Sequence, residues 1–191
     1  MKSKIHKLKK ATILVLAISF FSFTLLKEKQ VDVEASKISW IGKKVTGSHE
    51  GTINLQSGVL KFDGKKLVGG NFVIDMSTIN VTDMQGRGKA SLERHLKSDD
   101  FFGVEKHKTA TLEITKVTNQ YSDYEITGQL TIKDITKPIS FNMVIKENSA
   151  STKLMIDRTK FDIKYGSASF IDNLKDKAIS DEFELDVKLS F

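Results

Sequence analysis

Residues 183–191 read FELDVKLSF, an unbroken alternation of apolar and polar side chains. A period of two places every second side chain on the same face of a β-strand. The stretch therefore predicts a strand with one face in an apolar core and the other in water.

The same period recurs along the chain from about residue 36 onward. It is present at Ile38 and Trp40, at Phe72, Ile74 and Met76, at Ala110, Leu112 and Ile114, at Ile126, Leu130 and Ile132, at Phe141, Met143 and Ile145, and at Leu154 and Ile156. Short polar breaks separate these runs, at Asp63-Gly64, Asn119-Gln120, Lys133-Asp134 and residues 147–151. Turn-forming residues in these breaks predict that consecutive strands pair as antiparallel hairpins.

Two stretches interrupt the strand pattern. Residues 83–104 fit one short helix that begins near Ser91, and residues 166–177 read as a long loop. Many amphipathic strands in one small domain must close into a barrel or stack as a sandwich, because open sheet edges invite aggregation. The pattern predicts an all-β fold and leaves both architectures open. The interior of an eight-stranded barrel is either filled by side chains or holds one small ligand.

The N-terminus carries an export signal. Five lysines in residues 1–10 precede an uncharged, apolar run at residues 11–26, the pattern of a secretory signal peptide. An uncleaved membrane anchor is the alternative, since no small-residue cleavage site stands out. We therefore divide the chain into a signal peptide (1–26), a linker (27–35) and one domain (36–191), and expect a periplasmic or secreted protein of the cell envelope.

The charge of the chain argues against a nucleic-acid partner. The formal net charge is +6, but residues 1–26 hold five of the 30 basic side chains and none of the 24 acidic ones, so the remainder carries +1. Long-range attraction to polyanions is not expected from such a balance. The chain has no cysteine, which excludes disulfides and a lipid-modified cysteine.

The sequence offers no set of catalytic or metal-binding residues. Beyond the leader, His49, His95 and His107 lack the spacing of a metal site, so we expect no metal and no cofactor. There is no Gly-x-Ser-x-Gly elbow and no cysteine nucleophile. The chain is therefore not expected to be an enzyme, and an isoprenoid-processing activity lacks the carboxylate clusters that it would need.

Several short motifs in order along the chain resemble the YceI-like family. They are SWIG at residues 39–42, GSHEG at 47–51, GGNFVIDM at 69–76, HLKSDDFF at 95–102, GQLTIK at 128–133 and TKPI at 136–139. The resemblance implies a single eight-stranded, extended antiparallel, lipocalin-like β-barrel with one short helix and long covering loops. It also implies a hydrophobic pore that takes a polyisoprenoid or another long-chain amphiphilic lipid, for transport or storage.

The resemblance assigns candidate roles to residues already found by their pattern. The candidates to line the pore are Trp40, Phe72, Ile74, Met76, Phe101, Phe102, Leu112, Ile114, Leu130, Ile132, Phe141 and Met143. The candidate cations for a lipid headgroup are Arg87, Lys89, Arg94 and Arg158, because guanidinium and ammonium groups bind phosphate. The first two lie in a glycine-rich turn expected to precede the helix.

One alternative keeps the fold and changes the function. A barrel whose interior is filled by side chains would be a non-catalytic envelope interaction or stress module. In either case the mature domain is expected to be at most peripheral to the membrane, and the oligomeric state, including a homodimer, stays open.

Overall fold

The computed structural model describes residues 26–120 and 123–191, so the predicted signal peptide lies outside the described part apart from Leu26. The strands are β1 (Lys27–Gln30), β2 (Asp32–Lys44), β3 (Gly47–Asp63), β4 (Lys66–Val81), β5 (Thr109–Gln120), β6 (Asp123–Ile132), β7 (Ile135–Lys146), β8 (Ser149–Asp157) and β9 (Ile179–Ser190). The helices are α1 (Gly86–Lys97) and two short 3-10 turns, η1 (Arg158–Phe161) and η2 (Lys175–Lys177).

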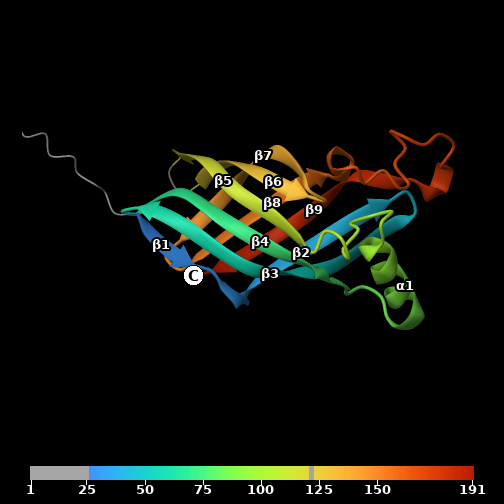
Figure 1. Cartoon of the computed structure of the whole chain (residues 1–191), viewed down its shortest axis with the longest axis horizontal. Helices are drawn as coiled ribbons and strands as arrows, with labels where there is room; N and C mark the ends of the chain where they lie inside the picture. The colour runs from blue at the N-terminus through green and yellow to red at the C-terminus, as the bar shows by residue number, and fades with distance from the viewer. Residues whose placement is uncertain (1–25, 121–122) are drawn as a thin grey trace, which may run out of the picture.

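The strands close into an antiparallel barrel of eight positions (Figure 1). Each strand from β3 to β8 pairs with the strand that follows it in the sequence. β2 closes the ring by pairing with both β9 and β3. Closure decides between the two architectures that alternation left open. It confirms the all-β, eight-stranded barrel with one α-helix and leaves few sheet edges unpaired.

The first position of the barrel is shared by β1 and β2. Both pair with β3, β1 with the stretch Val59–Phe62 and β2 with residues 47–53. The main-chain N–H of Val31, between the two strands, donates to the Gly58 carbonyl over 2.8 Å. Residues 27–35, which the sequence suggested as a linker, therefore belong to the barrel. Residues 27–30 carry no apolar side chain and lack the alternation of the other strands, whereas Val31, Val33 and Ala35 do alternate with acidic residues.

The predicted hairpins are largely present, with two shifts in place. The break predicted at residues 147–151 covers only residues 147–148, because β8 begins at Ser149. Lys133 and Asp134 form the β6–β7 turn with φ of 51° and 61°, the left-handed conformation of a tight two-residue hairpin turn. Gly64, with φ of 60°, forms the β3–β4 turn together with Lys65. Residues 119–120, predicted as a turn, are instead the last residues of β5.

The helix was predicted in the right region with the wrong start. It begins at Gly86 rather than near Ser91, so Arg87 and Lys89 lie within its first turns instead of in a preceding loop. Gly86 and Gly88 explain the error in the predicted start, because glycine is unfavourable in the interior of a helix. No side chain caps the N-terminus at Gln85, and no residue of α1 is fully buried. Among the described residues, no helix is long and apolar enough to span a bilayer.

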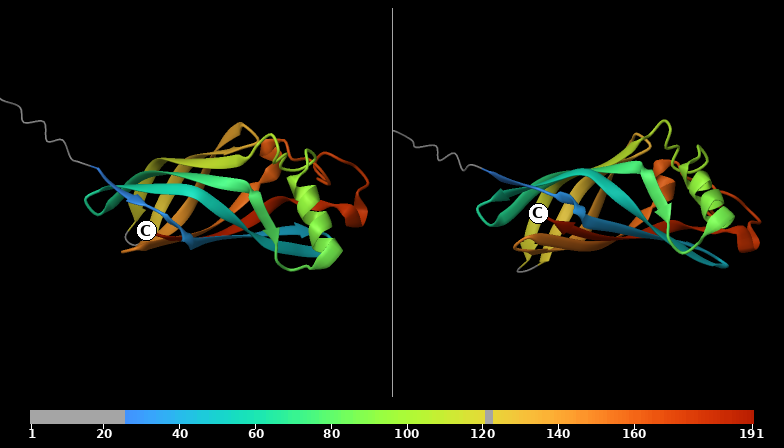
Figure 2. Two further views of the ribbon diagram at one scale, coloured as in Figure 1. Left: turned by 60° about the horizontal axis from the view of Figure 1, so that its bottom comes forward. Right: turned by 90° about the horizontal axis from the view of Figure 1, so that it is seen from below.

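Helix α1 lies at one end of the barrel, together with the β2–β3 turn and the loop that leads to β9 (Figures 1 and 2). We call this the α1 end. The C-terminus and β1 lie at the opposite end, which we call the closed end. There, Leu60, Phe62 and Leu67 are buried, and the Phe191 ring packs 6.2 Å from the Phe62 ring.

The barrel wall is incompletely paired between β7 and β8. These two strands share only the pairs from Val144–Ser151 to Lys146–Ser149, toward the closed end. The ladder stops where the Thr152 hydroxyl donates to the Asn142 carbonyl over 2.6 Å. Toward the α1 end β7 continues to pair with β6 alone and β8 with β9 alone. This seam leaves β7 and β8 unpaired with each other along the part of the wall toward the α1 end.

Candidate functional site

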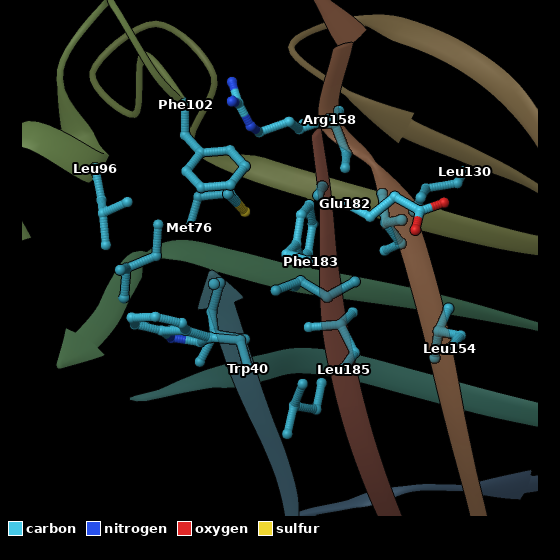
Figure 3. A pocket seen from close by; sticks show the side chains of 18 of the residues that line it. Trp40, Met76, Leu96, Phe102, Leu130, Leu154, Arg158, Glu182, Phe183 and Leu185 are labelled. Carbon is cyan, nitrogen blue, oxygen red and sulfur yellow. The ribbon is translucent and has the colours of Figure 1, made fainter. Parts of the chain in front are cut away.

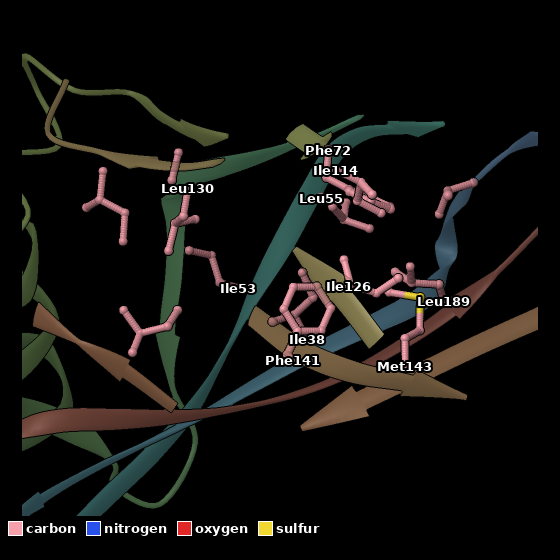
Figure 4. Packing of buried hydrophobic residues seen from close by; sticks show 14 of the residues in the cluster. Ile38, Ile53, Leu55, Phe72, Ile114, Ile126, Leu130, Phe141, Met143 and Leu189 are labelled. Atoms are coloured by element: carbon pink, nitrogen blue, oxygen red, sulfur yellow. The ribbon is translucent and has the colours of Figure 1, made fainter. Parts of the chain in front are cut away.

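The barrel contains an apolar cavity of about 380 Å³ that extends to the α1 end. Figure 3 shows Trp40, Phe102, Phe183 and Leu185 directed toward a common space from strands β2 and β9 and from the segment after α1. Figure 4 shows apolar residues that pack in this interior, several of which, including Met143 and Leu189, also line the cavity. The volume lies within the range of small-molecule binding pockets.

The change from packed core to cavity is visible along β9. Leu189, near the closed end, is buried, whereas Val187, Leu185 and Phe183 are only partly buried although their side chains also face the interior. An inward-facing apolar side chain keeps accessible surface when no other side chain fills the space beside it. The interior therefore opens progressively toward the α1 end.

Eleven of the twelve residues predicted for the pore line this cavity: Trp40, Phe72, Ile74, Met76, Phe101, Phe102, Leu112, Leu130, Ile132, Phe141 and Met143. The twelfth, Ile114, is not among the lining residues and belongs to the packed apolar core. It shares an alternating run with Leu112, but lies further toward the closed end of β5. Periodicity assigns a side chain to the inner face and says nothing of its depth along the barrel.

The structure adds lining residues that the prediction left out. Some lie on alternating strands and carried the same signal: Ile38, Ile53, Leu55, Leu154, Ile156, Phe183, Leu185, Val187 and Leu189. Others come from α1, where Leu92, His95 and Leu96 face the cavity. The spacing of these three residues is that of one helical face, which could have identified them once the helix was placed.

Polar side chains line the cavity mainly at the α1 end. Lys43 and Lys44 come from the end of β2, Ser180 and Glu182 from the start of β9, and Tyr165 from the loop after η1. An elongated amphiphile would therefore find apolar walls in the body of the cavity and charged groups at its mouth.

Arg158 lies in the cavity wall, but its guanidinium is already engaged. The side chain is 2% exposed and donates to the carbonyls of Ser180 (2.9 Å), Ile163 (2.7 Å) and Ile179 (3.1 Å). Burial lowers the pKa of Arg158, while Asp181 and Asp157 act in the opposite direction. The residue joins η1 to the start of β9 and leaves few free donors for a headgroup.

The other three headgroup candidates lie on α1 and are not brought together with Arg158. Arg87, Lys89 and Arg94 are absent from the cavity lining. The Lys89 ammonium group donates to the Asn80 side chain over 2.7 Å and lies 3.5 Å from a carboxylate oxygen of Glu93. Their assignment to a headgroup stays a prediction.

His95 places a polar ring among aromatic residues at the mouth. Its ring centroid lies 4.5 Å from that of Tyr165 and 5.5 Å from that of Phe101, both edge-on. The Nε2 atom is buried and has no hydrogen-bond partner among the described residues. Of the other histidines in the described part of the chain, His49 Nδ1 lies 2.8 Å from the Asp83 carboxylate and His107 Nδ1 lies 2.9 Å from the Asp134 carboxylate.

Two carboxylates anchor the segments around the mouth. Burial is the largest single effect on Asp83 and acts to raise its pKa, but the hydrogen bond with His49, backbone hydrogen bonds at Glu50 and Asp83 and the charge of His49 together lower the pKa. The hydroxyl groups of Ser167 and Ser169 lower the pKa of Asp181, and the Arg158 guanidinium adds to this effect. Each anionic carboxylate thus ties a connecting segment to the barrel.

A closed eight-stranded barrel with an apolar internal cavity and a polar mouth defines a class of small barrel proteins suited to hold an amphiphilic molecule. A YceI-like domain matches residues 30–191, so the chain belongs to the YceI-like family.

Sequence relatives and solved structures agree with this family. The chain is 33% identical over 92 residues to a UPF0312 protein of Pectobacterium atrosepticum, covering 48% of this chain and 46% of that one. It is 33% identical over 90 residues to protein YceI of Escherichia coli, covering 47% and 45%. The matched region thus spans about half the length of these curated relatives.

Two solved structures share the fold. The crystal structure of Burkholderia cenocepacia BcnA has a TM-score of 0.67 at 22% identity, over 83% of this chain and 98% of that one. A polyisoprenoid binding domain from Saccharophagus degradans, implicated in plant cell wall breakdown, has a TM-score of 0.61 at 16% identity, over 86% and 97%. At these identities the likeness concerns the fold alone.

Proposed function

We propose that this protein binds a long-chain isoprenoid or a similar amphiphilic lipid in its barrel and carries or stores it in the cell envelope. The observation that carries the proposal is the apolar cavity of about 380 Å³, which is walled by side chains from the barrel strands and has its charged groups at the mouth. A polyisoprenoid tail offers only apolar surface, and burying it contributes roughly 25 cal/mol per Å² before ordering costs.

Two further observations support the same proposal. The predicted signal peptide favours a location in the cell envelope. Long-chain isoprenoid lipids are confined to membranes there, so a lipid would need a carrier protein to pass through water from one membrane to another. The described neighbour from Saccharophagus degradans is a polyisoprenoid binding domain. The filled-barrel alternative lacks a comparable observation, because an apolar cavity of about 380 Å³ lies inside the barrel.

The proposal is tested by filling the cavity from one strand face. Leu154 lines the cavity, whereas its neighbour Met155 is 50% exposed on the outer face of β8. Leu154→Trp should abolish uptake of a polyprenyl lipid, measured by native mass spectrometry, and Met155→Trp should leave uptake intact. Equal uptake by both folded variants would place the lipid outside the barrel and contradict the proposal.

A further inference from the structure

We propose that the α1 end of the barrel docks onto a lipid bilayer, with Val45, Phe170 and Ile171 entering the interface. The proposal rests on the proposed function, because a lipid that is taken up or released must pass between the cavity and a membrane. It adds the surface through which this exchange occurs and the orientation of the barrel during it.

Exposed apolar side chains gather at this end. Val45, at the tip of the β2–β3 turn, is 65% exposed, and Phe170 and Ile171, in the loop before η2, are 55% and 43% exposed. Large apolar side chains exposed on adjacent loops mark an interaction surface more often than isolated ones do.

Hydrogen bonds hold these tips beside the cavity. The Val45 N–H donates to the Ala178 carbonyl over 3.1 Å, and the N–H groups of Phe170 and Ile171 donate to the Ser167 carbonyl over 3.2 and 2.9 Å. The side chain of Ser169 is in turn bonded to Asp181 at the start of β9. The two loops are thus built onto the strands that form the mouth, at the same end of the molecule in Figure 1.

The charges beside these tips suit an anionic bilayer. Lys43 and Lys44 immediately precede Val45, and Lys175 and Lys177 follow the loop. Within residues 26–120 and 123–191 none of the four forms an ion pair. Lysines next to inserted apolar residues keep their ammonium groups at the headgroup level. Asp172 and Asp176 lie in the same loop, so insertion of the apolar tips carries most of the affinity and charge adds to it.

The closed end supplies a matched control. Val68 is also exposed, at 41%, and follows Lys65 and Lys66 at the β3–β4 turn, but it lies at the end of the barrel away from the cavity mouth. A non-specific attraction of exposed valine and lysine to vesicles would affect both ends alike. Docking of the mouth predicts a response at the α1 end only.

The chain has no cysteine, so a single introduced cysteine gives a unique label. Ile171→Cys and Val68→Cys are labelled with the polarity-sensitive dye NBD and mixed with vesicles of equal parts phosphatidylcholine and phosphatidylglycerol. The label at position 171 should brighten several-fold and shift to the blue, and the label at position 68 should not change. Residues 11–26 precede β1 at the closed end, so any membrane binding by them would affect the label at position 68 rather than the label at position 171.

Vesicle flotation gives the corresponding affinities. Replacing both Phe170 and Ile171 by Ser should lower the partition coefficient about tenfold, and Val68→Ser should leave it unchanged. A silent label at position 171, or an equal response at position 68, would overturn docking. Brightening at position 171 on concentrating the protein without vesicles would assign the surface to a second copy of the chain and would also overturn it.

Polyprenyl lipid uptake is measured on the same samples to separate this proposal from the proposed function. Uptake with a silent label at position 171 contradicts docking and leaves lipid binding in place. A vesicle response at position 171 without any uptake supports docking and contradicts lipid binding.

Discussion

The large side chain of Trp40 packs against the barrel wall because its partner on the neighbouring strand, Gly51, has no side chain. The two residues are partners across the β2–β3 ladder, and the indole Nε1 donates to the Thr52 carbonyl over 3.2 Å. A methyl group on Gly51 would overlap the Trp40 ring and the Asn80 carbonyl oxygen. Glycine at this position therefore allows the indole to lie against the β3 backbone.

Gly51→Ala is predicted to destabilise the protein by about 2 kcal/mol, because the added carbon displaces the ring or the backbone. Gly42→Ala is the control, since no atom lies within 4 Å of a Cβ built there. Urea unfolding of both variants checks the prediction. Equal stabilities would show that the β2–β3 pair accommodates the methyl group without displacement.

Arg158 is predicted to act on stability rather than on lipid affinity. Arg158→Gln removes donors to buried carbonyls and should cost about 3 kcal/mol of unfolding free energy. Arg94→Gln, at an exposed position of α1, should cost little. A stable Arg158→Gln variant with weakened lipid binding would instead support the headgroup role predicted from sequence.

Trp40 and Arg158 show which features of the fold the sequence predicts and which it does not. Alternation places Trp40 on the inner face, because the period of a strand is local to the chain. The contacts of Arg158 with residues about twenty positions away depend on how η1 meets β9, which no local pattern encodes. For the same reason the inner-face assignment was right for Ile114 while its depth along the barrel was missed.

At the scale of elements, the loop between η1 and β9 depends on the ionisation of Asp181. The folded-state pKa of this carboxyl is lowered, so its contribution to stability is complete above the unfolded pKa of about 3.9 and is lost as the pH falls through the lower folded-state value. Acidification below about pH 4 should therefore loosen residues 166–178.

Hydrogen exchange, corrected for intrinsic rates, tests this loosening. Exchange in residues 166–178 should accelerate at low pH in the wild type and be fast at all pH values in Asp181→Asn. Asp172→Asn changes a carboxylate of the same loop that forms no hydrogen bond or ion pair with a described residue, and should behave like the wild type. An unchanged loop in Asp181→Asn would refute the anchoring role.

The elements differ in how well sequence predicts them. Strands with clear alternation, such as β9, were placed correctly, whereas β1 was missed because its lysines and glutamate lack an apolar face. The start of α1 was displaced because Gly86 and Gly88 resemble a turn, and tertiary contacts rather than propensity hold it. Leu92 and Leu96 line the cavity from this helix, so an error in its start hid part of the site.

At the scale of the whole molecule, the barrel joins two different ends. The closed end is packed by Leu60, Phe62 and Phe191, and the α1 end holds the cavity, the incomplete β7–β8 seam and the exposed tips. Core packing stabilises one half of the barrel while the other half keeps space for a ligand.

This division predicts that truncations at the two ends have different effects. Leu60→Ala should destabilise by about 3 kcal/mol, as expected for a fully buried side chain, without changing lipid uptake. Leu185→Ala, in the cavity wall, should cost less stability and alter lipid affinity. Thermal unfolding and uptake measured on both variants check the contrast, which fails if Leu185→Ala is the more destabilised of the two.

The most direct test of lipid binding is mass spectrometry of the lipids extracted from protein purified from its own envelope fraction without detergent. A stoichiometric long-chain isoprenoid or similar amphiphile is the predicted result. Protein that carries no lipid and takes up no polyprenyl ligand when it is offered would contradict lipid binding and favour a protein-interaction role for the barrel.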